Sequence, residues 1–231
     1  MNMGKEQYRH ELKYQIEYAD YLGMRSRLKR VMQVDPHAGA EGIYRVHSIY
    51  FDNYRDRALR EKIQGLAERE KFRIRFYNED RSYFVLEKKQ KRDSLCRKTG
   101  AVLDARECGE LLHGHTGWMR GHPSGLVREL YARMQDQVLR PRVMVSYVRE
   151  AYLYKAGNVR VTFDSQIRTT LFDRSFLQKE ESGICASDKP GDRILEVKYD
   201  AFLPEIVSGM IQTGNLRQQA FSKYALCRRF G

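Results

Sequence analysis

Charged side chains, most of them basic, occupy alternate positions in five separate segments of the sequence. The five sets are Arg9-Glu11-Lys13, Lys71-Arg73-Arg75, Glu87-Lys89-Lys91, Arg160-Thr162-Asp164 and Glu196-Lys198. Because side chains of a β-strand point alternately to opposite faces, each set would lie on one face of a strand. Arginine suits phosphate because its planar guanidinium donates two hydrogen bonds at once. Several such strands in one sheet would form a cationic wall with a few carboxylates, which suits a polyanion together with a divalent metal ion.

The positions between these charges are apolar, as Phe72, Ile74 and Phe76 show in the second set. For any one strand taken alone, the charged face can be explained as an outer surface of the protein that faces water. Outer faces usually mix Thr, Ser and Gln with charges of both signs, whereas the same basic chemistry recurs here in every segment. A buried arginine without a partner would cost several kcal/mol, on the order of 3 or more. The charged face therefore meets solvent or an anion, and its recurrence favours an anion.

Four carboxylates share the alternation of the bases: Glu11, Glu87, Asp164 and Glu196. Each fits an ion pair with a base on a neighbouring strand. As a set, they also fit oxygen ligation of Mg²⁺ or Mn²⁺, with substrate phosphates completing the shell. Glu196 is the first candidate because it is central in an otherwise apolar strand. The sequence contains no phosphate-binding P-loop, dinucleotide-binding, zinc-protease or serine-hydrolase motif.

Strands and inserted helices must position these side chains. The predicted strands are 8–16, 43–51, 69–78, 81–91, 95–103, 142–155, 157–168 and 193–200, with a hairpin turn at 156–158. The predicted helices are 18–33, a short helix from Asn53 to Gly65, 104–113, 124–139, 204–212 and 216–229, and a polar loop is expected at 178–192. This order indicates an α+β fold with a largely antiparallel sheet. Eight strands with one polar face can close into a barrel whose lumen carries the charges.

Composition sets the class of partner and the compartment. A chain of 231 residues with 42% hydrophobic residues fits one domain spanning 1–231. The net charge of +12 implies an anionic partner. The sequence has no long apolar run that would span a membrane and no apolar signal segment. Its four cysteines have no metal-binding spacing, which predicts reduced thiols and a cytoplasmic protein.

Nine short segments, in order, resemble the VTC domain. They are YRHELKY (8–14), SIYFDN (48–53), LREKIQG (59–65), KFRIRFYN (71–78), VLEKKQ (85–90), SYVREAY (146–152), VRVTFD (159–164), LEVKYD (195–200) and FSKY (221–224). That domain is the catalytic polyphosphate-polymerase domain of the vacuolar transporter chaperone complex and its bacterial relatives. It belongs to the triphosphate tunnel metalloenzymes, together with the CYTH proteins. The resemblance runs over nearly the whole chain.

The resemblance implies an eight-stranded antiparallel β-tunnel, a closed barrel with flanking helices, whose bases hold a triphosphate or polyphosphate. By motif, the implied phosphate ligands are Lys13, Arg73, Arg75, Lys89, Arg149, Arg160 and Lys223, with Lys98 and Lys198 as additions. The implied metal ligand for Mn²⁺ or Mg²⁺ is Glu196, with Glu11 and Glu87 as further candidates. The resemblance implies a phosphotransferase that moves the terminal phosphate of ATP onto a polyphosphate chain.

The sequence departs from the family pattern at two positions. Tunnel hydrolases of the CYTH type begin with ExExK, and Arg9 replaces the first acid here. This change favours the polymerase over a two-metal hydrolase. Ala220 stands where VTC sequences often carry another lysine, so one phosphate contact is expected to be missing. The sensor domain and membrane helices of the yeast proteins are not expected from this sequence.

Three functions fit the charged face. The first is the polyphosphate polymerase, the second a tunnel triphosphatase acting on inorganic or nucleoside triphosphate, and the third a non-catalytic binder of polyphosphate or nucleic acid. A nucleic-acid binder would interleave exposed aromatic side chains with bases for stacking. Phe72 and Phe76 instead fall on the opposite face from the bases. The pattern therefore favours ATP, triphosphate or polyphosphate over nucleic acid, and it does not identify a protein partner.

Overall fold

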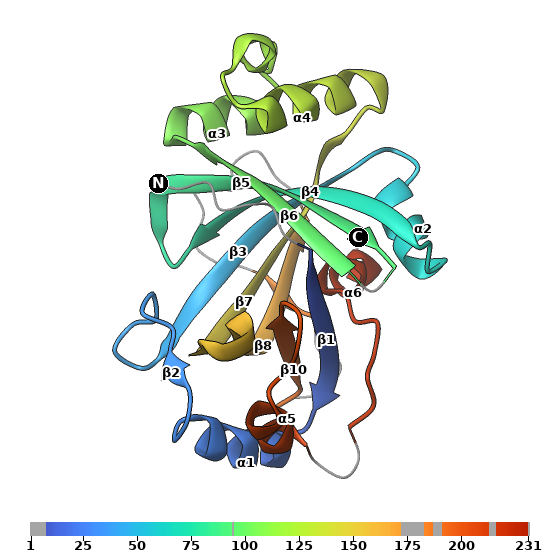
Figure 1. The fold of residues 1–231 in the computed structure, drawn as a ribbon. Coiled ribbons are helices and arrows are strands. Elements are labelled where there is room, and N and C mark those ends of the chain that lie inside the picture. The colour runs from blue at the N-terminus through green and yellow to red at the C-terminus, as the bar shows by residue number, and fades with distance from the viewer. Residues whose placement is uncertain (1–7, 94, 172–182, 187–190, 213–215, 231) are drawn as a thin grey trace.

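Eight antiparallel strands close into a ring in a computed structural model that describes residues 8–93, 95–171, 183–186, 191–212 and 216–230. Around the ring the order is β7-β3-β4-β5-β6-β1-β10-β8, and β8 pairs back to β7 (Figure 1). The strands are β1 (Arg9–Ile16), β3 (Ile43–Asp52), β4 (Glu68–Tyr77), β5 (Asp80–Arg92), β6 (Leu95–Leu103), β7 (Arg140–Tyr154), β8 (Val159–Leu171) and β10 (Arg193–Tyr199). The short strands β2 (Gln33–Val34) and β9 (Ile184–Cys185) extend the sheet at β7 and β8. The predicted α+β fold with an eight-stranded antiparallel tunnel is confirmed.

Neighbouring strands bring their charged positions together because the sheet register places them opposite one another. Lys13 of β1 lies opposite Glu196 of β10, and Thr162 of β8 faces Glu196 from the other side. Arg73 of β4 lies opposite Glu87 of β5. Since side chains alternate along each strand, the rest of the charged face follows these residues into the interior of the ring.

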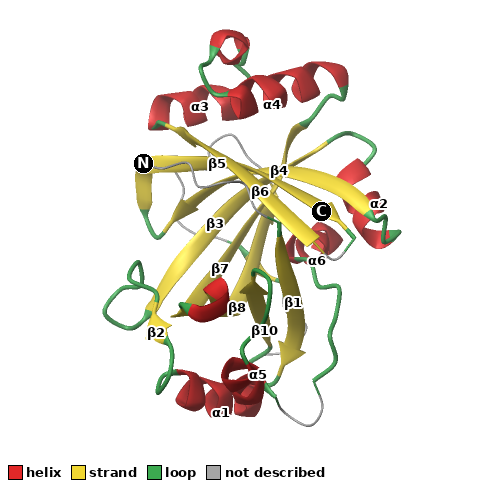
Figure 2. Ribbon diagram, viewed as in Figure 1, coloured by secondary structure: helices red, strands yellow, loops and turns green. Residues whose placement is uncertain are grey.

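The apolar faces of the strands turn outward and are covered by helices on two sides of the ring. α3 (Ala105–His113) and α4 (Gly125–Asp136) cover one side, and α1 (Tyr18–Leu28) and α5 (Glu205–Ile211) cover the other (Figure 2). The core under α3 and α4 includes Ile49, Phe72, Ile74, Phe84, Leu86 and Leu130. The core under α1 and α5 includes Met24, Leu28, Val161, Phe163, Leu195, Val197 and Val207. No helix in the described ranges is long and apolar enough to cross a membrane.

A short C-terminal helix, α6 (Lys223–Cys227), packs against β7, β8 and α2 (Arg57–Ile63). Its Tyr224 is buried with Tyr50 and Tyr147 in a third apolar cluster. The Tyr224 hydroxyl donates a 2.6 Å hydrogen bond to Asp52 Oδ2 at the end of β3. Asp52 also accepts hydrogen bonds from two backbone N–H groups at the start of α2. This carboxylate therefore joins β3, α2 and α6 and fixes the helix that carries Lys223.

The C-terminal segment differs most from its prediction, because only Lys223–Cys227 of the predicted helix 216–229 forms an α-helix. The Gln219 N–H donates to the carbonyl of Lys13 at 2.9 Å, and Gln218 forms a β-bridge with Tyr14. Pairing with the edge of β1 thus replaces helical hydrogen bonds in this segment. We call residues 218–222 the strap, because they run from β1 into α6.

Three other helices also differ from the predicted bounds. The first ends at Leu28 instead of residue 33, and the fourth at Asp136 instead of residue 139. Just beyond the latter, Val138 adopts a left-handed φ of 55°, which a helix cannot continue through. The predicted cap Asn53 does not begin α2, whose N-cap is Asp56. Most of the predicted loop 178–192 lies outside the described residues.

Removing the Tyr224 hydroxyl tests how α6 is held. Tyr224→Phe keeps the ring and leaves Asp52 without one charged hydrogen bond. We expect a loss of about 1.5–3 kcal/mol in the free energy of unfolding, measured by urea denaturation. Tyr54→Phe is the matched control, because Tyr54 is 65% exposed. Equal, small changes in both variants would show that the Asp52 contact does not hold the helix.

Candidate functional site

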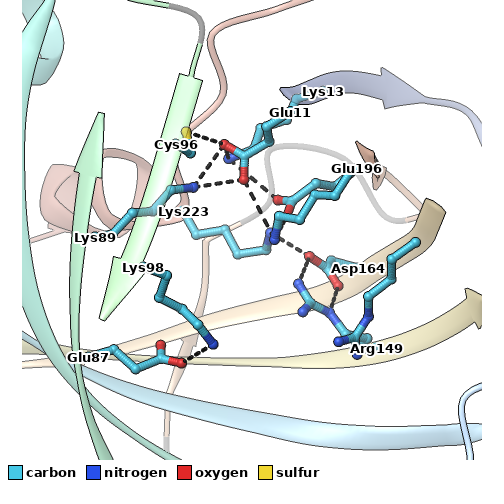
Figure 3. A network of polar contacts seen from close by, with 12 residues as sticks. Glu11, Lys13, Glu87, Lys89, Cys96, Lys98, Arg149, Asp164, Glu196 and Lys223 are labelled. Carbon is cyan, nitrogen blue, oxygen red and sulfur yellow. Dashed lines mark hydrogen bonds and ion pairs between the residues drawn. The ribbon is translucent and has the colours of Figure 1, made fainter. Parts of the chain in front are cut away.

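The ring interior gathers most of the predicted site residues into polar contacts (Figure 3). They come from strands far apart in the sequence and from α6. The residues that meet there are Glu11, Lys13, Arg73, Arg75, Glu87, Lys89, Lys98, Arg149, Asp164, Glu196, Lys198 and Lys223. They form three groups, each centred on one or two carboxylates.

The first group contains Glu11 and Glu196, which share their lysines. Lys13 Nζ lies 3.4 Å from a carboxylate oxygen of each. Lys89 Nζ donates to both oxygens of Glu11, at 2.7 and 2.8 Å. Lys198 forms an ion pair with Glu196 and lies 3.6 Å from Glu11. Two acids are thus surrounded by three bases, and the group has excess positive charge.

The second group is centred on Asp164, which is fully buried. Arg149 binds it with two parallel hydrogen bonds, from Nε at 2.7 Å and from Nη2 at 2.8 Å. Lys223 Nζ lies 2.5 Å from Oδ2 and over the ring of Tyr147, 4.7 Å from its centroid. One carboxylate therefore orients two of the predicted phosphate ligands.

The third group is centred on Glu87, which accepts a 2.7 Å hydrogen bond from Arg73 Nε and a 2.8 Å hydrogen bond from Lys98 Nζ. Arg75 Nε lies 3.7 Å from the same carboxylate. Arg73 also donates to the hydroxyl of Tyr50. Every member of this group except Tyr50 was predicted from the sequence.

Arg160 does not join these groups. Its guanidinium forms an ion pair with Asp35 at 2.6 Å and donates to the Tyr44 hydroxyl at 2.6 Å. Asp35 was not a predicted site residue, because its segment was interpreted only as a loop. The carboxylate is 4% exposed and also accepts hydrogen bonds from His37. Arg160, a predicted phosphate ligand, is therefore paired with Asp35 of that loop in this structure.

The interior carboxylates are ionised at neutral pH although they are buried. Burial alone would raise the pKa of each. For Glu196, Lys198 and Lys13 outweigh burial and hold the pKa well below its ordinary value. Arg73 and Arg75 do the same for Glu87. For Asp164, burial is outweighed by Arg149 and Lys223, which lower its pKa to about 2.

The three predicted metal ligands are not in one place. Glu11 and Glu196 share lysines, whereas Glu87 belongs to another group. Among the described residues, no group of three or more His, Cys, Asp or Glu side chains is arranged to hold a metal ion. A divalent ion such as Mg²⁺ often uses only one or two carboxylates and completes its shell with substrate phosphates and water. The ionised carboxylates Glu11 and Glu196 share lysines and fit that arrangement as a pair, whereas Glu87 lies in the third group.

A pocket of about 440 Å³ opens beside the first group and shows a base that the predicted site did not include. Lys71 lines this pocket with Lys13 and Lys89. Its ammonium lies 5.6 Å from the ring centroid of Tyr50 and 5.9 Å from that of Tyr224. Lys71 alternates with Arg73 and Arg75, and this pattern alone places it on the same face of the strand. The family motif did not assign Lys71 a role.

Comparisons with known proteins agree with this fold. The profile of the VTC domain matches residues 8–230. No curated protein matches the sequence. HpAC1 from Hippeastrum has a similar structure, with 13% identity, a TM-score of 0.56 and coverage of 96% of both chains. A protein from Bacillus halodurans, provisionally assigned as an adenylate cyclase, shows 16% identity over 84% of this chain and 81% of that chain, with a TM-score of 0.49. At 13% identity, the likeness to HpAC1 shows the fold alone.

Replacing Asp164 tests whether the interior acids stabilise the ring. Asp164→Asn leaves Arg149 and Lys223 buried without their counter-charge. We expect it to lower the free energy of unfolding by about 3 kcal/mol at pH 7, measured by urea denaturation. Asp136→Asn, at an exposed helix end, is the control.

The pH dependence of this difference has a definite sign. The pKa of Asp164 is lowered from 3.8 to about 2, so its contribution is complete above pH 3.8 and disappears as the pH falls through about 2. The difference between wild type and Asp164→Asn should therefore be constant near neutral pH and shrink in acid. A difference that grew in acid would contradict this assignment.

Proposed function

The chain belongs to the VTC domain family, and from this we propose that it is a metal-dependent polyphosphate polymerase that transfers the terminal phosphate of ATP to a polyphosphate chain inside the ring. The observation that carries the proposal is the excess of bases over acids on the interior face. The first group alone places Lys13, Lys89 and Lys198 around two carboxylates. An enclosed surface with this imbalance suits a ligand with many negative charges.

Phosphate would bind by adding to, or replacing, the carboxylate contacts of these bases. A lysine ammonium has three N–H donors and a guanidinium has five, so each can serve a carboxylate and a phosphate at once. Arg73 and Arg149 are oriented by their carboxylates before any ligand arrives. Because this order exists beforehand, little entropy is lost when the phosphates bind.

Transfer between two phosphates needs positioning and neutralisation of charge more than covalent chemistry. In this proposal, the bases of the second and third groups neutralise the transferring phosphoryl and the leaving diphosphate. Arg149 and Arg75 are largely buried, so their charges are only weakly screened by water. The closed ring also limits access of water, which a polymerase must exclude to avoid hydrolysis.

Glu196 and Glu11 would hold the divalent ion, since their carboxylates are ionised and adjoin the bases that would take the phosphates. When bound, such an ion neutralises phosphate oxygens and orients them. Lys13 and Lys198, which pair with Glu196 here, would then turn toward phosphate.

A triphosphatase is the second candidate, because the same interior would bind inorganic or nucleoside triphosphate. HpAC1, which shares this fold, is described as having a dominant triphosphatase activity. Arg9 weighs against hydrolysis here: it stands where hydrolases carry an acid, and it pairs with Asp200 at 2.8 Å. A non-catalytic binder is the third candidate, and it follows from the missing lysine at Ala220.

The products formed from ATP distinguish these candidates. With ATP and Mn²⁺, we expect ADP and chains that an exopolyphosphatase degrades, because the enclosed bases favour a phosphate acceptor over water. The products would be resolved by gel electrophoresis. Orthophosphate in amounts equal to ADP, without chains, would assign a triphosphatase. The absence of turnover with ATP or triphosphate across several metals would assign a binder.

Glu196→Gln tests the chief metal ligand, because it keeps the size of the side chain and removes the charge that a divalent cation needs. We expect turnover at saturating Mn²⁺ to fall by about 10²–10³-fold. Triphosphate binding, measured by calorimetry, should be largely retained because the bases remain. Glu205→Gln, on the exposed start of α5, is the control. Unchanged turnover in Glu196→Gln would exclude Glu196 from this role.

A further inference from the structure

The loop between β2 and β3 places an acid beside a base of the ring. Asp35 directly follows β2, and its backbone N–H donates to the carbonyl of Ala151 on β7 at 2.9 Å. Pro36 comes next, and the His37 N–H donates to Asp35 Oδ1 at 3.1 Å, which is the hydrogen bond of an Asx turn. The Ala38 N–H donates to the carbonyl of Asp35 at 2.9 Å and closes the turn. The local sequence thus fixes both the backbone and the carboxylate of Asp35.

Arg160 of β8 is the base that this carboxylate meets. It lies on the same face of its strand as Asp164 and opposite Lys198 of β10 in the sheet register, so its side chain starts from the interior face. Arg160 Nη2 lies 2.6 Å from Asp35 Oδ2. Its Nε is buried and has no hydrogen-bond partner among the residues that the structure describes. Arg160 therefore keeps a donor that an interior anion can use.

The contact between Arg160 and Asp35 differs from the other interior ion pairs in burial. The side chains of Arg149 and Asp164 are 7% and 0% exposed, so neither can be hydrated if the other is lost. The Arg160 side chain is 34% exposed and can turn to water or to another anion. Ion pairs with a partly exposed cation contribute little to stability. The fold therefore depends less on this pair than on the pair within the second group.

Asp35 also keeps other partners when Arg160 leaves it. The backbone N–H and the ring Nδ1 of His37 lie 3.1 and 2.9 Å from Oδ1, and the Tyr44 hydroxyl lies 3.5 Å from Oδ2. Burial raises the pKa of Asp35, but the hydrogen bonds of His37 and the charge of Arg160 outweigh burial and lower the pKa. A buried carboxylate that retains donors loses less than one left without any. Arg160 can thus exchange Asp35 for another anion.

We propose that Asp35 determines the affinity of the interior for phosphate, because it is a built-in anion that a phosphate must displace from Arg160. The inference rests on the proposed function for the class of ligand, a triphosphate. Wild type then binds triphosphate more weakly than its bases alone would allow, which favours release of a charged product.

Two effects of Asp35 on phosphate binding oppose each other. Its charge repels a nearby phosphate and neutralises Arg160, which at the edge of a protein interior lowers anion affinity by on the order of a hundredfold. Its contact also orders the Arg160 side chain, and the order of one side chain raises affinity by about tenfold or less. The charge is the larger effect, so removing it should strengthen binding.

A double-mutant cycle tests whether Asp35 acts through Arg160. The variants are Asp35→Asn, Arg160→Gln and the two together, and triphosphate binding to each is measured by calorimetry without ATP. Glu41→Gln is the matched control, because it removes an exposed negative charge from the same loop. Urea denaturation of every variant measures the effect on the fold separately.

We expect Asp35→Asn to bind triphosphate about tenfold more tightly than wild type. In the Arg160→Gln background the same substitution should change the affinity by less than about twofold, because no arginine remains for it to release. Glu41→Gln should stay within about twofold of wild type. If Asp35→Asn does not fold, Asp35→Ser keeps an acceptor for the His37 N–H and should show the same gain.

Weaker or unchanged triphosphate binding by Asp35→Asn would overturn the proposal, and so would an equal gain in the Arg160→Gln background. Failure of the proposed function looks different, because it would be an absence of chain synthesis by wild type. A wild type without synthesis, whose triphosphate affinity still rises on Asp35→Asn, would contradict the polymerase and support the role of Asp35. No triphosphate binding by either protein would overturn both.

Discussion

Enclosing like charges in a closed ring is the constraint on which this structure depends. Most strands of the ring turn bases inward, and a buried cation without a counter-charge would destabilise the fold. The acids Glu11, Glu87, Asp164 and Glu196 meet that demand, and each contacts at least two bases. The interior is thus both a stabilising ionic network and a preordered set of donors for phosphate.

The outer parts of the fold make this interior possible. Helices on two sides cover the apolar strand faces, which leaves the other faces free to carry charge. The strap and α6 complete the interior from the C-terminal end, because Gln219 pairs with β1 and Tyr224 is tied to Asp52. Lys223 reaches Asp164 only because these two contacts fix the helix that carries it.

The sequence predicted the strands and the interior face well, because a period of two is a local property that the register preserves. It named Glu196 as the main metal ligand with Glu11 and Glu87 as further candidates, and the structure places Glu87 in a different group from the other two. Which acids meet depends on the order of strands around the ring, and alternation along single strands does not contain that order. The ion pair of Arg160 was missed in a similar way, since its partner Asp35 comes from a loop far away in the sequence.

The ends of the helices were also predicted poorly, because contacts with other parts of the fold decide where a helix stops. The strap has a helical pattern in sequence but pairs with an open edge of β1, so an external hydrogen-bond partner outweighs local propensity. Lys71 was available from the alternation with Arg73. Its position beside Lys13 and Lys89 in one pocket emerges only from the fold.

A crystal structure with triphosphate and Mn²⁺ bound tests most directly the central claim that interior bases exchange carboxylate contacts for phosphate contacts. The account predicts phosphates inside the ring, within hydrogen-bond distance of Lys13, Arg73, Arg149 and Lys223, with Glu196 released toward the metal. Triphosphate bound on the outer surface, with every interior ion pair intact, would contradict it.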